Sequence, residues 1–386
     1  MVTSSPGIGH IFPSIPTAWA LRTAGHDVLV AMSGCTEKVA EAGLPVVDVS
    51  PGVDYVKLQS DFVKRNPDMA LKPRERSGEE SEDADFQFDN IARLFAAVSE
   101  PTVDLTVELA RHWRPDVVLY TPVDGTGPLA AAAMGVPAVM HGFNVVLGAE
   151  MTSAIAARMS AHYQRYGLTS GGVEPAAILD VVPASLRRKY REQDNVWPMR
   201  YLPYNGGGVL PQWLTAPRKR PRVVVTLGST IPVFGGVDLL RQFVRAAGEV
   251  DAEFVLALAG ADLSGLGELP DNLVPVEWIP LGELLDEADA VIHHGGSGSM
   301  LTALTAGLPQ YILPHGADNF VNAKLMRAHG LGEELTPGEI DAKRITELIE
   351  NKAMRAAAQE VAAEMRAQDS FSTLIPKLAD LAGQKA

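Results

Sequence analysis

Short apolar runs alternate along the chain with stretches of helical spacing. The runs are brief, rich in valine and mostly closed by glycine or proline, which favours buried strands over helices. In the first half they are His26–Gly34, Val46–Val49, Asp116–Tyr120 and Pro137–Gly142, and in the second half Arg222–Ser229, Glu253–Gly260, Val274–Trp278, Ala290–Gly296 and Gln310–Pro314. Because parallel neighbours need a long crossover, this alternation predicts an α/β protein with two doubly wound parallel sheets.

The chain length of 386 residues agrees with two domains. We expect their junction in the glycine- and proline-rich stretch Tyr201–Arg222, whose composition is typical of an exposed linker. The predicted parts are an N-terminal domain over 1–202, a linker over 203–222, a C-terminal domain over 223–365 and a terminal helix over 366–386 that crosses back. The densely charged stretch Asp61–Phe86 is expected to form a mobile surface loop.

The composition restricts the classes of ligand. A net charge of −14 argues against a general nucleic-acid binder, because a phosphate backbone needs a basic face. The single cysteine, Cys35, excludes an internal disulfide framework and a cysteine-based zinc site. No apolar stretch approaches the ~20 residues of a membrane span, and the start "MVTSSPGIGH" lacks signal-peptide features. We therefore expect a cytoplasmic protein without a membrane partner.

The stretch His293–Gln310, "HHGGSGSMLTALTAGLPQ", joins an apolar run to a helical segment through a glycine-rich turn. Adjacent histidines on a strand point to opposite faces, so His293 and His294 are poorly placed to share a metal ion. A glycine-rich turn that opens a helix near Ser297–Ser299 offers unsatisfied amides to a phosphate, and a histidine adds a donor. The pattern favours a phosphate site, and the alternative is that the glycines only form a tight turn.

The longer run "HHGGSGSMLTALTAGLPQYILPHGADNFVNA", His293–Ala323, closely resembles the donor signature of family 1 nucleotide-sugar glycosyltransferases. It is most similar to the actinobacterial branch that tailors antibiotics. "SSPGIGHIFPSIPTAWALRTAGHDV" near the start and "VVTLGST" near the middle resemble the openings of that family's acceptor and donor domains. The resemblance implies the GT-B fold, in which two facing Rossmann-like domains hold the active site in the cleft between them.

The resemblance also implies roles for donor-binding residues. His294, Gly296, Gly298 and Ser299 would bind the diphosphate, with Gly228, Ser229 and Thr230 contacting it from the other loop. Trp278 would stack on the nucleobase, and Asp318, Asn319 and Asn322 would bind the sugar. Two positions depart from the family pattern, because Gly298 stands where many relatives have asparagine and Asn319 where glutamine is common.

The predicted base is His10, which lies where the first strand passes into the first helix. An imidazole of ordinary pKa, ~6.5, is mostly neutral at physiological pH and can accept the proton of an acceptor hydroxyl. A base histidine usually has an orienting carboxylate. Many relatives place an aspartate where this chain has Thr121, so we take Asp124 as the candidate, with the alternative that it caps the helix starting near Thr126.

These residues together predict a metal-independent, inverting glycosyltransferase. It would move a deoxysugar from a dTDP- or UDP-sugar to an aromatic or polyketide natural product, with no cofactor; the sequence also allows a homodimer. The Asp-x-Asp sequence Asp83–Asp85 lies in a charged stretch and is interpreted as a solvated patch rather than a metal site. Two alternatives stay open, a nucleotide-sugar 2-epimerase of the same fold and a non-catalytic nucleotide-sugar-binding protein. An NAD-dependent dehydrogenase is disfavoured because Phe12 occupies the third glycine position of its fingerprint.

Overall fold

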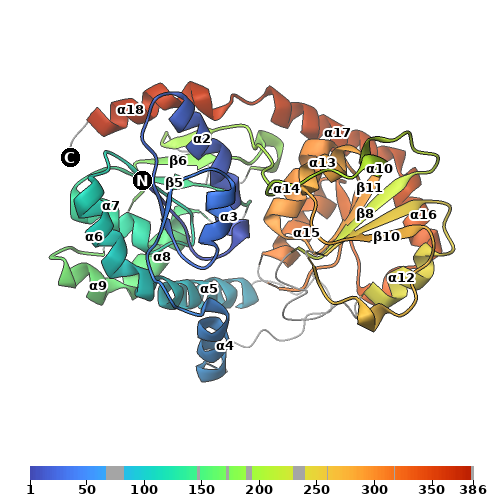
Figure 1. Ribbon diagram of the computed structural model, residues 1–386, viewed down its shortest axis with the longest axis horizontal. Helices are drawn as coiled ribbons and strands as arrows, with labels where there is room; N and C mark the ends of the chain where they lie inside the picture. The colour runs from blue at the N-terminus through green and yellow to red at the C-terminus, as the bar shows by residue number, and fades with distance from the viewer. Residues whose placement is uncertain are drawn as a thin grey trace.

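The computed structural model describes residues 1–66, 82–145, 148–170, 174–187, 194–228, 240–258, 260–316 and 318–383, with the side chains of 82–87 excepted. Two α/β domains lie side by side, and the C-terminal helices run along one edge of both (Figure 1). Each domain is built on a parallel sheet, so the predicted fold class of two Rossmann-like domains is confirmed. Within these residues, we find no helix with both the length and the apolar character needed to cross a membrane.

The N-terminal sheet has seven strands in the order β3-β2-β1-β4-β5-β6-β7, and every neighbouring pair is parallel. The strands are β1 (Val2–Thr3), β2 (Val30–Met32), β3 (Val46–Asp48), β4 (Val118–Tyr120), β5 (Ala138–His141), β6 (Ala177–Asp180) and β7 (Val196–Pro198). The α-helices are α1 (Ile8–Ile11), α2 (Ile15–Thr23), α3 (Thr36–Glu41), α4 (Tyr55–Arg65), α5 (Glu82–Ser99), α6 (Val103–Trp113), α7 (Thr126–Met134), α8 (Ala149–Arg158) and α9 (Ser160–Arg165). The strand order reverses between β1 and β4, which is the point where doubly wound folds bind ligands.

The C-terminal sheet has six strands in the order β10-β9-β8-β11-β12-β13, again all parallel. The strands are β8 (Arg222–Thr226), β9 (Glu253–Ala257), β10 (Leu273–Val276), β11 (Ala290–His293), β12 (Gln310–Ile312) and β13 (Gly332–Glu334). The α-helices are α10 (Gln212–Thr215), α12 (Arg241–Ala247), α13 (Leu281–Asp286), α14 (Ser297–Ala306), α15 (Asn319–Ala328), α16 (Ala342–Glu350), α17 (Lys352–Ala367) and α18 (Ile375–Gly383). Its order reverses between β8 and β11, so this sheet has a second switch point.

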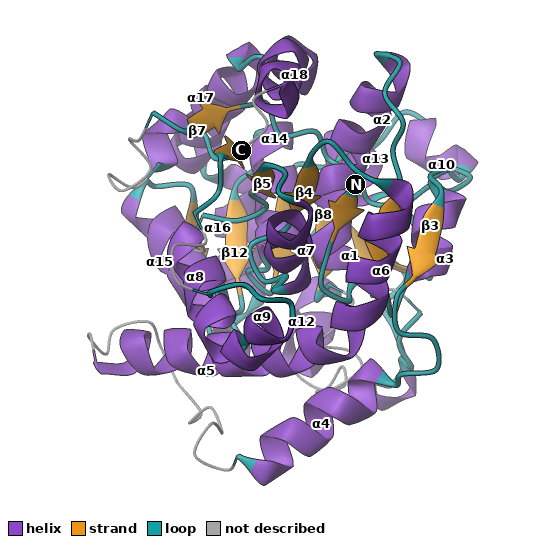
Figure 2. Ribbon diagram, turned by 90° about the vertical axis from the view of Figure 1, so that its left-hand side faces the viewer, coloured by secondary structure: helices purple, strands orange, loops and turns teal. Residues whose placement is uncertain are grey.

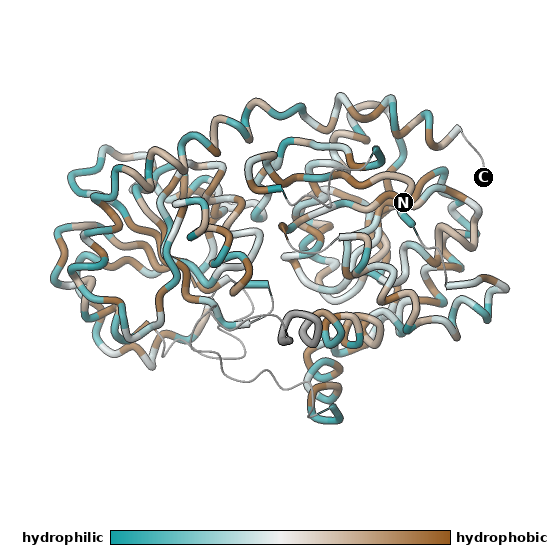
Figure 3. The backbone as a smooth tube through the Cα atoms, turned by 180° about the vertical axis from the view of Figure 1, so that it is seen from behind, coloured by the Kyte–Doolittle hydropathy of each residue, from teal (hydrophilic) through white to brown (hydrophobic). Residues whose placement is uncertain are grey.

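Burial on both faces explains the valine-rich strands. Val223 and Val225 of β8 pack into one apolar cluster, whereas Val224 between them packs into another on the opposite face. A strand covered on both sides needs a continuous apolar run rather than alternation. In Figure 3 the hydrophobic colours accordingly gather on the strands inside each domain.

The C-terminal tail links the two domains. α17 packs against α14 of the C-terminal domain, and the same apolar cluster continues through Phe371 and Leu374 to Ile11 and Ile15. Arg200, which follows β7, joins the tail to the N-terminal domain: its backbone N–H donates to the Asp369 carbonyl at 2.8 Å, and its Nε donates to the Gln368 carbonyl at 3.0 Å. The tail is thus hydrogen-bonded to the N-terminal domain just before the linker begins.

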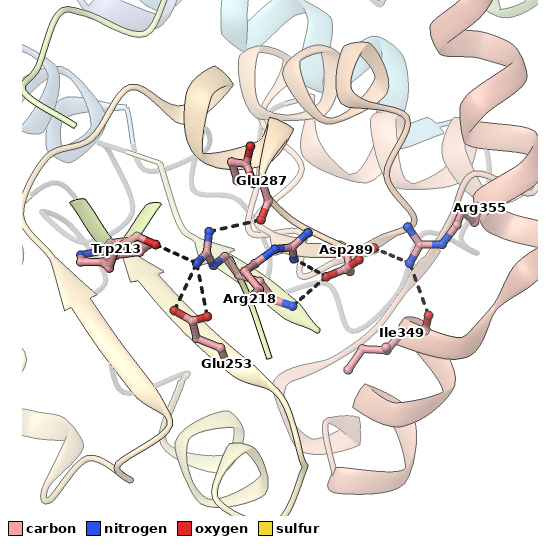
Figure 4. Close-up of polar contacts among 8 residues, drawn as sticks. Trp213, Arg218, Glu253, Glu287, Asp289, Ile349 and Arg355 are labelled. Atoms are coloured by element: carbon pink, nitrogen blue, oxygen red, sulfur yellow. Dashed lines mark hydrogen bonds and ion pairs between the residues drawn. The ribbon is translucent and has the colours of Figure 1, made fainter. Parts of the chain in front are cut away.

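Polar contacts anchor the second half of the linker at the base of the C-terminal sheet (Figure 4). Arg218 forms an ion pair with Asp289, and the buried Arg222 forms another with Glu253 at 3.3 Å. The Asp289 carbonyl also accepts a hydrogen bond from Arg355 of α17 at 2.8 Å. Arg218 and Arg222 therefore fix the linker to the C-terminal domain.

The prediction of a surface loop over Asp61–Phe86 is wrong at both ends, which α4 and α5 occupy; residues 67–81 lie outside the described part. Figure 2 shows α4 projecting from the domain. The Asp54 carboxylate caps α4 by accepting the Lys57 N–H at 2.9 Å, and Lys57 pairs with Asp61 at 2.6 Å. These local polar contacts stabilise a helix whose apolar side chains also recur at helical spacing, at Tyr55, Leu58 and Phe62.

Candidate active site

A histidine lies at each switch point. His10 belongs to α1, directly after the central strand β1 of the first sheet. His294 follows β11 of the second sheet and precedes α14. Both loops are at the carboxyl ends of their strands, where an α/β fold presents its ligand-binding groups.

His10 is held by a backbone carbonyl and two aromatic rings. Its Nδ1–H donates to the Pro6 carbonyl at 3.0 Å, so the neutral ring carries its lone pair on Nε2. The ring centroid lies 5.5 Å from that of Phe95 and 5.4 Å from that of Phe143. Gly7 begins this turn at φ 118°, a conformation that favours glycine. The arrangement leaves Nε2 as the proton acceptor.

The pKa of His10 lies below its ordinary value of 6.5, chiefly because burial disfavours the charged ring. Hydrogen bonds to the Pro6 and Ser5 carbonyls oppose that shift only in part. The imidazole is therefore neutral at physiological pH, which is the state that a base requires.

Asp124 lies at the start of α7. Its carboxylate accepts hydrogen bonds from the backbone N–H groups of Thr126 at 2.9 Å and Gly127 at 3.2 Å. Burial raises its pKa, and these hydrogen bonds, together with one from Thr3, oppose the rise. In the described part of the chain, no hydrogen bond or ion pair joins a carboxylate to His10. Asp124 therefore caps the start of α7, as the alternative interpretation had it. It does not contact the ring of His10, which it was expected to orient.

Thr121, where the family resemblance implies an aspartate, does not supply His10 with a charged partner either. Its hydroxyl donates to Ser4 Oγ at 3.3 Å, and both side chains are buried. The orienting contact in this structure is the Pro6 carbonyl, which no side-chain pattern in the sequence could reveal.

The ring of His294 fits between two glycines. A Cβ on Gly228 would lie 2.6 Å from Cε1 of the ring, and a Cβ on Gly296 would lie 2.3 Å from Nε2. Both glycines were predicted to contact the donor; the structure adds that they make room for the imidazole. Burial, with the neighbouring His293 and His315 rings, lowers the pKa of His294 to about 3. Its Nδ1 is buried without a hydrogen-bond partner, whereas a hydrogen bond between the ring and the Thr226 backbone opposes part of the lowering of the pKa.

His293 has a structural role on the other side of the strand. Its Nε2–H donates to Oε1 of Gln310 at 2.8 Å, and its Nδ1 accepts the N–H of Gly295 at 3.0 Å. Burial lowers its pKa to about 4, and its ring plane is turned 89° from that of His294. Across the residues with described side chains, no group of three or more His, Cys, Asp or Glu is placed to hold a metal ion.

The predicted sugar-binding residues form a buried network behind the glycine turn. The Ser297 hydroxyl donates to Oδ2 of Asp318 at 2.6 Å, and burial raises the pKa of that carboxyl. The Asn322 amide donates to the Gly295 carbonyl at 2.8 Å and to Oδ2 of Asp318 at 3.3 Å. Because Asn322 is fully buried, it supports the turn rather than facing a ligand. Asn319 is the first residue of α15 and is mostly buried.

The remaining donor-side residues are more open. Trp278 follows β10 with 42% of its surface exposed, and the ammonium of Lys38, from α3 of the other domain, lies 5.7 Å from its ring centroid. A Cβ on Gly298 would meet no atom within 4 Å, and Ser299 is half-buried in the first turn of α14. Ser229 and Thr230 lie outside the described residues. Two cavities of about 320 and 470 Å³ lie elsewhere, beside Trp197 and beside Arg218–Pro221, and contain none of the predicted site residues.

Family models match both domains. Residues 19–228 match the N-terminal domain of the erythromycin biosynthesis protein CIII-like family, and residues 241–381 match its C-terminal domain. Elloramycin glycosyltransferase ElmGT of Streptomyces olivaceus is 35% identical over 390 residues, which span 100% of this chain and 96% of ElmGT.

The solved structures that this chain resembles are also glycosyltransferases. The glycosyltransferase SnogD from Streptomyces nogalater matches with a TM-score of 0.84 and 41% identity, covering 99% of this chain and 98% of SnogD. The spinosyn rhamnosyltransferase SpnG, complexed with thymidine diphosphate, matches with a TM-score of 0.79 and 28% identity, covering 98% of this chain and 99% of SpnG. Each comparison spans both domains.

Proposed function

Since this chain belongs to the erythromycin biosynthesis protein CIII-like family of glycosyltransferases, we propose that it transfers a deoxysugar from a dTDP- or UDP-sugar to an aromatic or polyketide natural product. In this reaction the acceptor atom forms a bond to the anomeric carbon of the sugar. The bond between that carbon and the nucleoside diphosphate breaks, and the acceptor proton passes to the enzyme.

The donor side of the proposal rests on His294 and the turn around it. The first amides of α14 have no partner within the helix, so they can donate to the diphosphate. They would stabilise the negative charge that grows on the leaving group, together with a donated N–H from His294. The proposal assigns no role to a metal or other cofactor.

The donor chemistry has two further supports. SpnG binds thymidine diphosphate and is named for transferring rhamnose, a 6-deoxy sugar, which favours a dTDP-deoxysugar over a UDP-sugar. Asn319, which by the family resemblance stands where glutamine is common, is shorter by one methylene and mostly buried, so it would reach fewer sugar hydroxyls. Trp278 would supply a flat surface for the base, beside the ammonium of Lys38.

The acceptor side of the proposal rests on His10. Its Nδ1–H is bound to the Pro6 carbonyl, so Nε2 is free to take the acceptor proton. The half-buried Phe88, Ile91 and Phe95 lie along one side of α5, and Phe95 contacts the His10 ring. We assign these side chains to an apolar wall for the acceptor. Attack from this side, opposite the diphosphate, would invert the configuration at the anomeric carbon.

The observation that carries the proposal is the pair of histidines at the two switch points, one with its Nδ1–H bound to the Pro6 carbonyl and one seated between two glycines. Mass spectrometry of reactions that pool dTDP- and UDP-sugars with aromatic and polyketide aglycones tests it. We expect a glycosylated aglycone from at least one dTDP-deoxysugar. An altered nucleotide sugar in the absence of any aglycone would instead indicate an epimerase, and tight nucleotide binding without any product would indicate a binding protein.

A further inference from the structure

We infer that the loop after β2 positions the base: Gly34 packs against Pro6 and thereby holds the Pro6 carbonyl at Nδ1 of His10. Gly34 is thus a positioning residue, which acts through Pro6 rather than on the substrate. This inference rests on the proposed function, because it takes His10 as the base of that reaction. It follows from the contacts of a single peptide unit, the one that joins Pro6 to Gly7.

This peptide unit is held at both of its polar groups. Its carbonyl, from Pro6, accepts the Nδ1–H of His10 at 3.0 Å. Its N–H, from Gly7, donates to the Cys35 sulfur and opposes the rise that burial causes in the pKa of that thiol. A trans peptide unit is planar, and its C=O and N–H point in opposite directions, so a fixed N–H also fixes the carbonyl. The loop after β2 therefore sets the direction of the group that holds His10.

The ring of Pro6 depends on packing for its place. Proline has no backbone N–H to donate, so a hydrogen bond from its nitrogen cannot anchor it. Gly34 supplies a close contact instead, since a Cβ at this position would lie 3.0 Å from Cβ and 3.8 Å from Cα of Pro6. Gly34 has a φ of 85°, a conformation that favours glycine. The loop thus approaches Pro6 at a distance that only a residue without a side chain allows.

The other side of Gly34 is anchored. A Cβ there would also lie 3.4 Å from Cδ2 of Tyr55, and the Tyr55 hydroxyl is hydrogen-bonded to Oγ of Ser50 at 2.6 Å. The Ser50 N–H in turn donates to the carboxylate of Asp48, the last residue of β3, at 3.0 Å. Because that side is held to the sheet, a side chain added at Gly34 would displace Pro6.

The consequence for the reaction is the placement of the proton on His10. With the Pro6 carbonyl at Nδ1, the neutral ring keeps its proton there and its lone pair on Nε2. Once the carbonyl moves away, the proton can reside on Nε2 instead, and that tautomer has no lone pair there for the acceptor proton. Displacing Pro6 therefore removes part of the enzyme from the state that a base requires.

A comparison of Gly34→Ala with Gly52→Ala in the full-length enzyme tests the inference. Gly52 has a φ of 83°, close to that of Gly34, but its Cβ would meet no atom within 4 Å. The two variants thus carry similar backbone strain, and only Gly34→Ala displaces Pro6. We expect kcat of Gly34→Ala to lie about tenfold or more below that of Gly52→Ala, since misplacing a reacting group by about 1 Å can cost ~100-fold. The affinity for thymidine diphosphate should be the same in both, because the donor site lies in the other domain.

The tautomer of His10 gives a second readout, which a loss of stability alone would not change. In protein with isotope-labelled histidine rings, nuclear magnetic resonance shows which ring nitrogen carries the proton. The signals of His10 are those that disappear in His10→Gln. We expect the Nδ1–H tautomer in the wild type and in Gly52→Ala, and both tautomers in Gly34→Ala.

If Gly34→Ala does not fold, the other contact of the same peptide unit provides the test. Serine keeps an acceptor for the Gly7 N–H, whereas alanine does not. Cys35→Ser should therefore recover most of the kcat that Cys35→Ala loses. Equal kcat in these two variants would contradict the inference.

The outcomes separate the inference from the function beneath it. Equal kcat in Gly34→Ala and Gly52→Ala, or an unchanged His10 tautomer in folded Gly34→Ala, would overturn the positioning role and leave the glycosyltransferase assignment standing. If the wild-type enzyme transfers no sugar to any pooled aglycone, the transferase assignment falls instead. The tautomer measurement on the free protein then still decides whether Gly34 positions His10.

Discussion

The loop after β1 and the loop after β11 occupy equivalent places in their domains but treat their histidines in opposite ways. His10 is fixed: the Pro6 carbonyl takes its Nδ1–H, and two phenylalanine rings pack around it. His294 packs between Gly228 and Gly296, where a side chain on either would collide with its ring, and its Nδ1 has no hydrogen-bond partner. A base must have its lone pair placed before the substrate arrives, whereas a ligand-binding ring must be held where it can donate an N–H to the ligand. The same fold element thus supports two kinds of chemistry.

The largest expected effect comes from removing the fixed ring. His10→Ala should lower kcat by ~100-fold or more, because the acceptor proton then has no base. The affinity for thymidine diphosphate should stay within about twofold, since the donor site lies in the other domain. Steady-state kinetics measure the loss in kcat, and calorimetry measures the affinity for thymidine diphosphate. An undiminished kcat would remove His10 from the reaction.

The next effect comes from filling the space beside the second ring. Gly296→Ala places a Cβ 2.3 Å from Nε2 of His294, so the ring must move. We expect the affinity for thymidine diphosphate to fall by about tenfold, the loss of one hydrogen bond to a charged group. Gly338→Ala is the matched control, because Gly338 is not among the predicted donor-binding residues and its Cβ would meet no atom within 4 Å. If both variants weaken binding equally, the loss does not come from the imidazole of His294.

The pH dependence gives a smaller effect with a definite sign. A base works only when neutral, and burial lowers the pKa of His10 below 6.5, so activity should fall only below pH 6.5. At pH 6.0 a base with an unshifted pKa would keep about a quarter of its activity, and we expect kcat/KM to keep a larger fraction than that. A profile that bends at or above pH 6.5 in the wild type would show that a charged partner supports the ring.

The smallest effect is expected at Asp124. If the carboxylate only caps α7, Asp124→Asn should change kcat by less than about fivefold and cost about 1 kcal/mol of folding stability for one lost acceptor. A carboxylate that orients a base histidine behaves differently, since its amide variant loses about 10⁴-fold in kcat in serine proteases. Kinetics and urea unfolding of this one variant therefore distinguish the two roles. A loss of the larger size would restore Asp124 to the reaction centre.

Most of the fold could be predicted from the sequence. The valine-rich runs of the C-terminal sheet are buried on both faces, so periodicity and composition indicate them directly. The strand β6, Ala177–Asp180, was missed although its run, interrupted only by the buried Asp180, resembles the predicted strand Val46–Val49. β7, Val196–Pro198, was missed because a partly exposed edge strand carries little apolar signal. The helix α4 was missed although Tyr55, Leu58 and Phe62 recur at helical spacing, because the prediction followed the dense charge of Asp61–Phe86 instead.

The site could be predicted only where side chains define it. His10 and His294 lie where the motifs suggested, at the ends of β1 and β11. The Pro6 carbonyl is a backbone group, and the approach of Phe95 and Phe143 to His10 depends on how three distant segments fold together. Asn322 was placed among the ligand contacts because its motif position gives no information on burial.

A crystal structure with thymidine diphosphate tests most directly whether the loop after β11 binds the diphosphate while the loop after β1 holds the base. We predict that the diphosphate lies against the first amides of α14 with one oxygen within hydrogen-bond distance of Nε2 of His294, and that the Nδ1–H of His10 still donates to the Pro6 carbonyl. A diphosphate bound away from α14, or a His10 ring that turns to use Nδ1 on the ligand, would contradict the account.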